Sequence, residues 1–129
     1  MEVRPFLKVM VERKASDLFI TAGFPPSAKI DGEVTPLGEN PFTPAQSLEF
    51  VEALMTEAQI KEFHESRECN FAFAAKELGR FRVSAFWQRE SPGCVMRRIE
   101  TKIPLVEDLK LPPILKDLVM SKRGLIIMV

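Results

Sequence analysis

Apolar residues recur at helical spacing in three stretches of the first half of the chain. Residues 4–14 place an apolar stripe on one helical face, and Pro5 fits there because a helix tolerates proline in its first turn. Residues 43–46 (TPAQ) and 56–59 (TEAQ) each combine an N-cap threonine with a glutamine three positions later, the sequence form of a capping box. We therefore expect an N-terminal helix that covers a sheet, then a pair of helices that ends near Ser66.

Alternating apolar and polar residues predict β-strands around these helices. The dipeptide Asp31-Gly32 is typical of a two-residue hairpin turn. The longest alternating stretch, residues 79–99, predicts a β-hairpin that turns near Arg89 and Glu90. Other short β-prone runs cover residues 18–21, 28–30, 33–36 and 70–74. Five or six mostly antiparallel strands, with helices before and between them, indicate an α+β fold whose sheet is covered by helices.

The last thirty or so residues have a different pattern. Residues 101–112 are rich in proline and predict a linker, and residues 114–119 again show helical spacing. Residues 125–129 are apolar at every position, which is typical of a strand buried on both faces of a parallel sheet. We therefore expect residues 1–100 to form a first domain and residues 113–129 to be the first helix and strand of a second, incomplete one.

Arginine side chains gather on one face of the predicted hairpin. Antiparallel pairing places Arg82 close to Arg97, and Arg80 lies two residues from Arg82 on the same face. Like charges opposite each other repel, the hairpin offers no clearly placed carboxylate, and guanidinium groups suit phosphate oxygens. An anion is therefore a candidate ligand. Two alternatives remain: the arginines are solvated or pair with acids elsewhere, or a one-residue slip puts Arg98 in place of Arg97.

The composition excludes several kinds of binding and catalytic site. The 129 residues carry 18 basic and 18 acidic side chains, which gives no net charge and argues against binding to nucleic acid or to an anionic membrane. Cys69 and Cys94 are expected to be reduced, buried thiols of a cytoplasmic protein, and their separation argues against a zinc site. His64 is the sole histidine, so no catalytic triad is expected, and no glycine-rich phosphate loop is present.

Four ordered blocks resemble the N-terminal region of the type IV pilus retraction ATPases, the PilT/PilU family of the secretion-ATPase superfamily. The blocks are residues 15–32 (ASDLFITAGFPPSAKIDG), 79–88 (GRFRVSAFWQ), 95–104 (VMRRIETKIP) and 123–129 (RGLIIMV). Phe19 follows Leu18 where PilT-type sequences commonly have a histidine. This difference, with the segments ECNFAF and VMRRIET, makes the chain more similar to the PilU-like branch.

The resemblance implies a PAS-like N-terminal domain, a linker and a RecA-like motor domain, assembled as a hexameric ring that uses ATP and Mg²⁺. The block RGLIIMV resembles the strand before the Walker A loop, while the Walker A, Walker B and histidine boxes are absent from these residues. Residues 1–129 are therefore expected not to hydrolyse ATP or to hold a cofactor or metal by themselves. Whether the protein is an enzyme thus depends on the remainder of the motor domain.

The family likeness also implies a role, partners and a location. The function would be that of a ring-forming, nucleotide-closing domain in a motor for pilus retraction and twitching motility. Its partners would be further copies of itself, a PilT-like paralogue and the inner-membrane pilus machinery, with no nucleic acid and no membrane insertion, at the cytoplasmic side of the pilus base.

Two of the arginines match positions that, in the family, reach toward the terminal phosphate of the nucleotide. They are Arg82, in RVSAFWQ, and Arg97, the first arginine of MRRI, with Arg80 as a third candidate on the same face. The alternative function is a stand-alone PAS-like sensor or protein-docking domain, in which these arginines are incidental.

Overall fold

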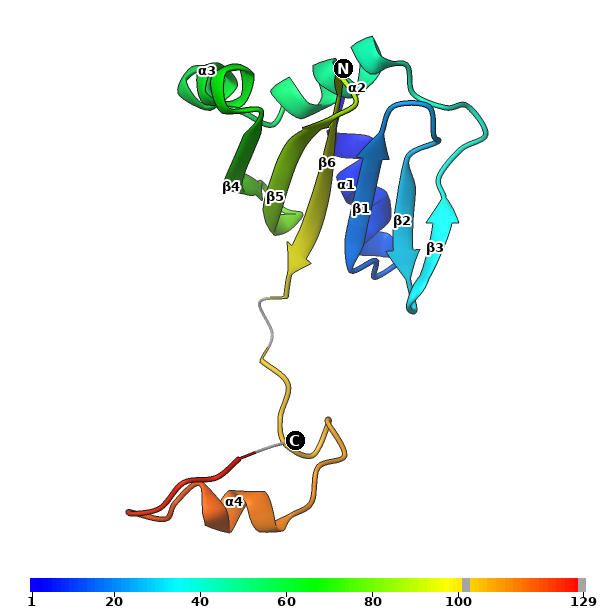
Figure 1. Cartoon of the computed structure of the whole chain (residues 1–129). Coiled ribbons are helices and arrows are strands. Elements are labelled where there is room, and N and C mark those ends of the chain that lie inside the picture. Colours follow the sequence, from blue (N-terminus) through cyan, green and yellow to red (C-terminus); the bar gives the residue numbers. More distant parts are fainter. Residues whose placement is uncertain (101–102, 128–129) are drawn as a thin grey trace. The chain divides into compact units, whose positions relative to one another are not determined.

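The chain divides into two compact units, Met1–Ile99 and Glu100–Val129, in a computed structural model that describes residues 1–100 and 103–127. The first unit is an α+β domain, as the sequence predicts (Figure 1). Its elements in chain order are α1 (Arg4–Glu12), β1 (Asp17–Thr21), β2 (Ser27–Ile30), β3 (Glu33–Pro36), α2 (Pro44–Glu52), α3 (Glu57–Ser66), β4 (Glu68–Ala75), β5 (Gly79–Gln88) and β6 (Ser91–Ile99).

The six strands form one antiparallel sheet in the order β3-β2-β1-β6-β5-β4. Two of the five strand pairings are two-residue hairpins. Asp31 and Gly32 join β2 to β3 with φ of 50° and 86°, and Arg89 and Glu90 join β5 to β6 with φ of 49° and 63°, as primed turns require. Strands β1 and β2, and β4 and β5, also pair as chain neighbours, and the pairing of β1 with β6 joins the N-terminal strands to the arginine hairpin.

Both predicted capping boxes are present at the helix starts. The Thr43 hydroxyl accepts from the Gln46 backbone N–H at 3.2 Å, and the Gln46 side chain accepts in return from the Thr43 backbone N–H at 2.9 Å. Thr56 and Gln59 make the same pair of contacts at the start of α3. These bonds satisfy N–H groups that have no partner within the helix.

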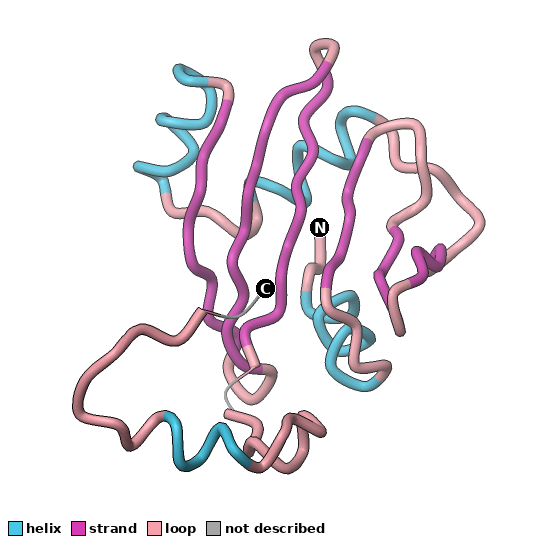
Figure 2. The backbone as a smooth tube through the Cα atoms, turned by 60° about the horizontal axis from the view of Figure 1, so that its bottom comes forward, coloured by secondary structure: helices cyan, strands magenta, loops and turns pink. Residues whose placement is uncertain are grey.

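The helices cover only one face of the sheet. In Figure 1, α1 and α2 lie behind the strands, and no described helix of the first unit lies in front of them; Figure 2 shows the strands side by side from a second direction. Along β5 the burial alternates, so that Phe81 and Val83 are buried while Arg80 and Arg82 are exposed. The core lies between the helices and the covered face. Its largest fully buried side chains include Leu7, Met10, Leu18, Ile20, Phe50, Phe63, Phe81 and Met96.

The two cysteines lie inside this core on either side of β5. Cys69 of β4 and Cys94 of β6 are both opposite Ala85, and both are free, buried thiols. Burial raises the pKa of Cys94 to about 12, so this thiol stays protonated at neutral pH. The pKa of Cys69 is also raised, mainly because the thiol is buried and in addition because Glu62 lies nearby.

The second unit contains α4 (Ile114–Leu118), and its helix falls where the sequence predicts one. The predicted strand over residues 125–129 is not formed at 125–127, while residues 128 and 129 lie outside the described part. A strand exists only where a neighbouring strand accepts its backbone hydrogen bonds, and the described residues of this unit contain no second strand. Leu125 and Ile127 are accordingly exposed. The assignment of residues 113–129 to a RecA-like domain stays a prediction.

Gly93 of β6 leaves no room for a side chain beside β1 and gives a test of the packing. A Cβ atom at this position would lie 2.7 Å from the Ile20 carbonyl oxygen and 3.3 Å from the Phe86 ring. We expect Gly93→Ala to lower the free energy of unfolding by about 1–3 kcal/mol, the usual cost of overpacking. Denaturant unfolding of the purified chain measures it.

The matched control for this substitution is Gly38→Ala. A Cβ atom there meets nothing within 4 Å and the backbone needs no positive φ. We expect no loss, or a gain of up to about 1 kcal/mol from the stiffer unfolded chain. Equal destabilisation by both substitutions would contradict the close β1–β6 contact.

Candidate functional site

Charged residues line up across the uncovered face of the sheet. Strand register places Arg82 directly opposite Arg97, Arg97 opposite Asp17, and Asp17 opposite Lys29. The predicted proximity of Arg82 and Arg97 is therefore observed. Arg98 is opposite the buried Phe81 and belongs to the other face, which excludes the alternative register.

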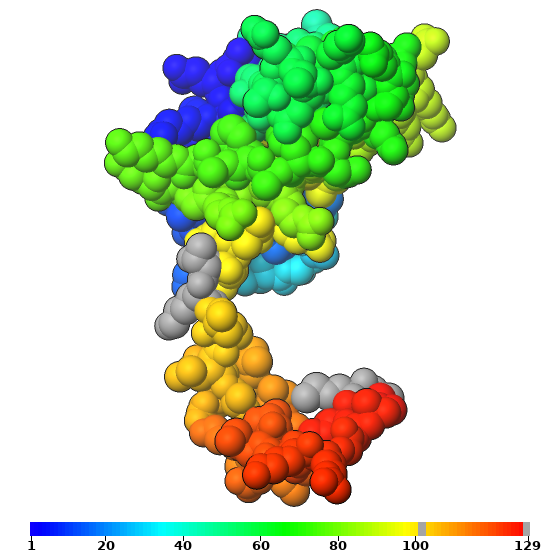
Figure 3. Space-filling model, turned by 90° about the vertical axis from the view of Figure 1, so that its left-hand side faces the viewer, coloured from blue at the N-terminus to red at the C-terminus, as the bar shows by residue number. Residues whose placement is uncertain are grey.

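The two arginines also border one hollow of the uncovered face. It has a volume of about 560 Å³ and lies over β4, β5 and β6. Besides Arg82 and Arg97, its lining includes the polar side chains of Asn70 and Ser84. Figure 3 views the first unit from the side of α3 and of β4, the edge strand beside this hollow. Arg80 is exposed on the same face, opposite Ile99, but does not line the hollow.

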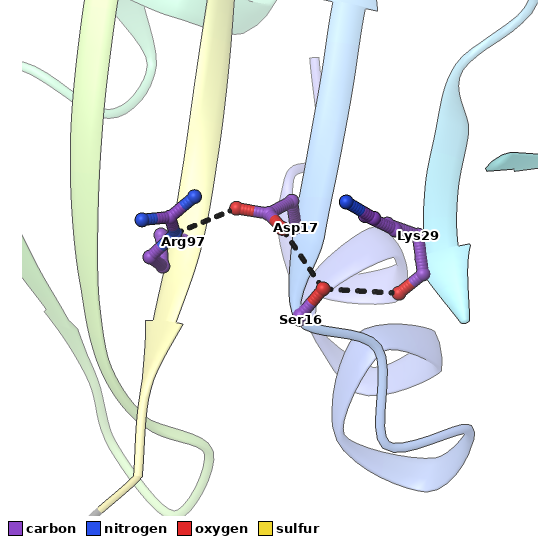
Figure 4. Close-up of polar contacts among 4 residues, drawn as sticks. All are labelled: Ser16, Asp17, Lys29 and Arg97. Carbon is purple, nitrogen blue, oxygen red and sulfur yellow. Dashed lines mark hydrogen bonds and ion pairs between the residues drawn. The ribbon is translucent and has the colours of Figure 1, made fainter. Parts of the chain in front are cut away.

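Asp17 is the residue that the sequence analysis missed. Arg97 donates from Nε to Asp17 Oδ1 at 2.8 Å, and Ser16 donates from Oγ to Asp17 Oδ2 at 2.8 Å (Figure 4). The hairpin itself contains no carboxylate for Arg97, as expected, but the acid comes from β1. The alternative prediction, that an acid from elsewhere in the chain pairs with the arginines, is therefore correct for Arg97. The prediction that neither arginine of the pair has a carboxylate partner is wrong.

The ion pair is asymmetric in its exposure. The Asp17 side chain is 8% exposed, whereas the Arg97 side chain is 71% exposed. The contact uses Nε alone, and no other hydrogen bond from Arg97 side-chain nitrogens to the described residues is observed. Nη1 and Nη2 are thus available to a ligand while the Nε end is held.

The charge of Asp17 is maintained against its burial. Burial alone would raise the pKa of this carboxyl group, but hydrogen bonds from Arg97 and Ser16, and the charges of Arg97 and Lys29, outweigh that effect. The pKa therefore lies below its usual value of 3.8, and Asp17 is a carboxylate at neutral pH.

Positive charge remains in excess on this face. Arg82 and Arg80 form no ion pair with any carboxylate in residues 1–100 and 103–127, and Lys29 adds a further cation on the other side of Asp17. Because the row Arg82, Arg97, Asp17 and Lys29 holds one carboxylate and three cations, an anion is the electrostatic complement of this part of the surface.

The other sequence candidates lie away from this face. His64 Nε2 is 2.7 Å from Glu52 Oε1, and the imidazole stands beside the Trp87 ring. Within the described ranges, no cluster of three or more His, Cys, Asp or Glu side chains has the arrangement of a metal site. No described helix has both the length and the apolar character needed to cross a bilayer.

The chain is similar in sequence to pilus ATPases of Pseudomonas aeruginosa. It is 55% identical to the type IV pilus ATPase PilU over all of its residues, which are 34% of that protein. It is 32% identical to the type IV pilus retraction ATPase PilT over 98% of its length, or 37% of that protein. The chain thus spans about one third of the length of these relatives. No protein-family model matches it.

Two solved structures have the same fold as this chain. A crystal structure of the pilus retraction motor PilT with bound ADP matches 96% of this chain with a TM-score of 0.78 and 31% identity, over 36% of that chain. The Legionella pneumophila ATPase DotB matches 94% of this chain with a TM-score of 0.74 and 15% identity, over 35% of its own chain. The DotB likeness shows the fold alone.

The lowered pKa of Asp17 predicts a pH-dependent stability. We expect Asp17→Asn to lower the free energy of unfolding at neutral pH and to matter less in acid. The carboxylate stabilises the folded state fully above about pH 5, and this contribution disappears as the pH falls through the folded-state pKa. Denaturant unfolding of both proteins from neutral to acidic pH measures the difference.

Glu39→Gln removes one exposed acid from the loop before α2 and serves as the control. A difference between wild type and Asp17→Asn that does not vary with pH would show that the carboxylate charge does not stabilise the fold.

Proposed function

The chain is a homologue of the type IV pilus ATPases PilU and PilT over their N-terminal third, and on this premise we propose that it is the N-terminal domain of a motor ATPase for type IV pilus retraction. In this role the domain closes over a nucleotide held by a motor domain and takes part in a hexameric ring. The motor powers or assists retraction and hence twitching motility.

We assign the phosphate contact to Arg82 and Arg97. The observation that carries this assignment is their direct opposition on the uncovered face, in one hollow, with exposed guanidinium groups. Two guanidinium forks side by side match the several oxygens of a terminal phosphate, which would remove their mutual repulsion. Arg80 adds positive charge at the border of the site.

The residues present fit the phosphate end of ATP, and they do not fit its Mg²⁺. The surface has an excess of arginine, while the sole acid in the row is already used by Arg97 and Ser16. Bound ATP would supply the phosphoanhydride bond that is hydrolysed, and Mg²⁺ would be held by the motor domain. Arg82 and Arg97 would bind and orient the terminal phosphate and stabilise the charge that develops on it.

This assignment gives the domain a mechanical role. Residues 1–100 form the closing domain, residues 101–112 the linker, and residues 113–129 the start of the RecA-like motor domain. Contact between the arginines and the terminal phosphate favours the closed arrangement, and loss of that phosphate removes the contact and allows opening. A PilT-like paralogue and the inner-membrane pilus machinery are the proposed partners, at the cytoplasmic side of the pilus base.

ATP hydrolysis by the full-length protein tests the assignment. We expect Arg82→Ala and Arg97→Ala each to lower kcat by about 100-fold, the usual effect of removing one donor that stabilises developing charge. A steady-state phosphate-release assay measures the rates. Arg13→Ala, which removes an exposed arginine after α1, is the charge-matched control and is expected to keep the wild-type rate. Wild-type rates in both site variants would exclude the phosphate role.

A further inference from the structure

Asp17 is a buried carboxylate although it lies on the uncovered face of the sheet. Its neighbours in the row across the sheet, Arg97 and Lys29, extend from the strands on either side, whereas the Asp17 side chain is only 8% exposed. Removing a carboxylate from water is costly, so the position is stable only while its oxygens receive hydrogen bonds. Ser16 and Arg97 supply these bonds, one to each oxygen.

The contact with Arg97 fixes the arginine at a specific atom. A bond to Nε restrains the rotation of the long side chain but leaves the two terminal nitrogens without a contact to the described residues. Asp17 lies on the β1 side of Arg97 and Arg82 lies on the β5 side, so the carboxylate offsets part of the positive charge of Arg97 without standing between the two arginines. The ion pair therefore lets Arg97 keep one orientation although Arg82 lies directly opposite.

Strand cohesion does not explain the ion pair. Strands β1 and β6 are already joined by backbone pairing over five residue pairs, and the Arg98 N–H donates to the Ser16 carbonyl at 2.9 Å just beyond β1. The backbone ladder therefore holds the two strands together without the ion pair. Besides its contribution to stability, the carboxylate fixes the orientation of Arg97.

We propose that Asp17 is a positioning residue that holds Arg97 through Nε, so that Nη1 and Nη2 are presented beside Arg82 to a phosphate group. This inference rests on the proposed function of the arginine pair. Ser16 extends the arrangement by one step, because its hydroxyl fixes the second oxygen of Asp17 and thereby the orientation of the carboxylate. Asp17 itself does not touch the phosphate.

The geometric part of the proposal is tested without nucleotide. In the ¹⁵N-labelled chain, we expect the Arg97 Nε–H to exchange with solvent more slowly than the Arg82 Nε–H, and Asp17→Ala to abolish this protection. Arg97→Lys identifies the resonance by its disappearance. Equal exchange at the two arginines in the wild-type chain would overturn the proposal.

The functional part is tested by a double-mutant cycle in the full-length protein. We expect Asp17→Ala to lower kcat for ATP hydrolysis by about 10-fold with a smaller change in KM, because displacement of an orienting group by about 1 Å can cost up to 10²-fold. Asp17→Asn keeps an acceptor oxygen for Nε and is expected to lose less. In an Arg97→Ala background, Asp17→Ala is expected to have no further effect.

The possible outcomes separate this inference from the proposed function. Additive losses in the cycle, or a wild-type kcat in Asp17→Ala while Arg97→Ala is impaired, would overturn the positioning role and leave the phosphate role intact. A wild-type kcat in Arg97→Ala would overturn the phosphate role, and the positioning role with it. Glu39→Ala controls for the loss of one acid, and thermal unfolding of each variant shows that the domain remains folded.

Discussion

The register of β6 against both of its neighbours is the constraint on which the arginine face depends. On one side, pairing with β5 places Arg97 opposite Arg82; on the other, pairing with β1 places it opposite Asp17. A slip of one residue on either side would send Arg97 to the covered face or separate it from its carboxylate. The Arg97 side chain thus lies between Arg82 and Asp17 because β6 lies between β5 and β1 in the sheet.

The local parts of the fold could be predicted from the sequence, because their signals are local. Capping boxes at residues 43–46 and 56–59, and the alternation through residues 79–99, depend on neighbours within a few positions. Counting residues on each side of the predicted turn then places Arg82 opposite Arg97, as the structure shows. The predicted strand at residues 125–129 shows the converse, because apolar residues at 125–127 form no strand without a second strand to pair with.

The contact between Asp17 and Arg97 could not be predicted in this way. The two residues are 80 positions apart, and nothing in the alternation of β1 indicates which strand lies beside it. Ser16-Asp17 has the appearance of an ordinary turn, and only the pairing of β1 with β6 shows that the acid faces an arginine. The sequence therefore identified the cations of the site, while tertiary structure supplied the group that orients one of them.

Both native thiols of the domain are buried between the sheet and the helices. We therefore expect them to react slowly with maleimides and similar thiol-specific labels. A single cysteine introduced at an exposed loop position such as Gly38 would therefore be labelled with a fluorophore in preference to Cys69 and Cys94. With a second dye on the motor domain of the full-length protein, the proposed closing movement would be measured as a change in energy transfer, one molecule at a time.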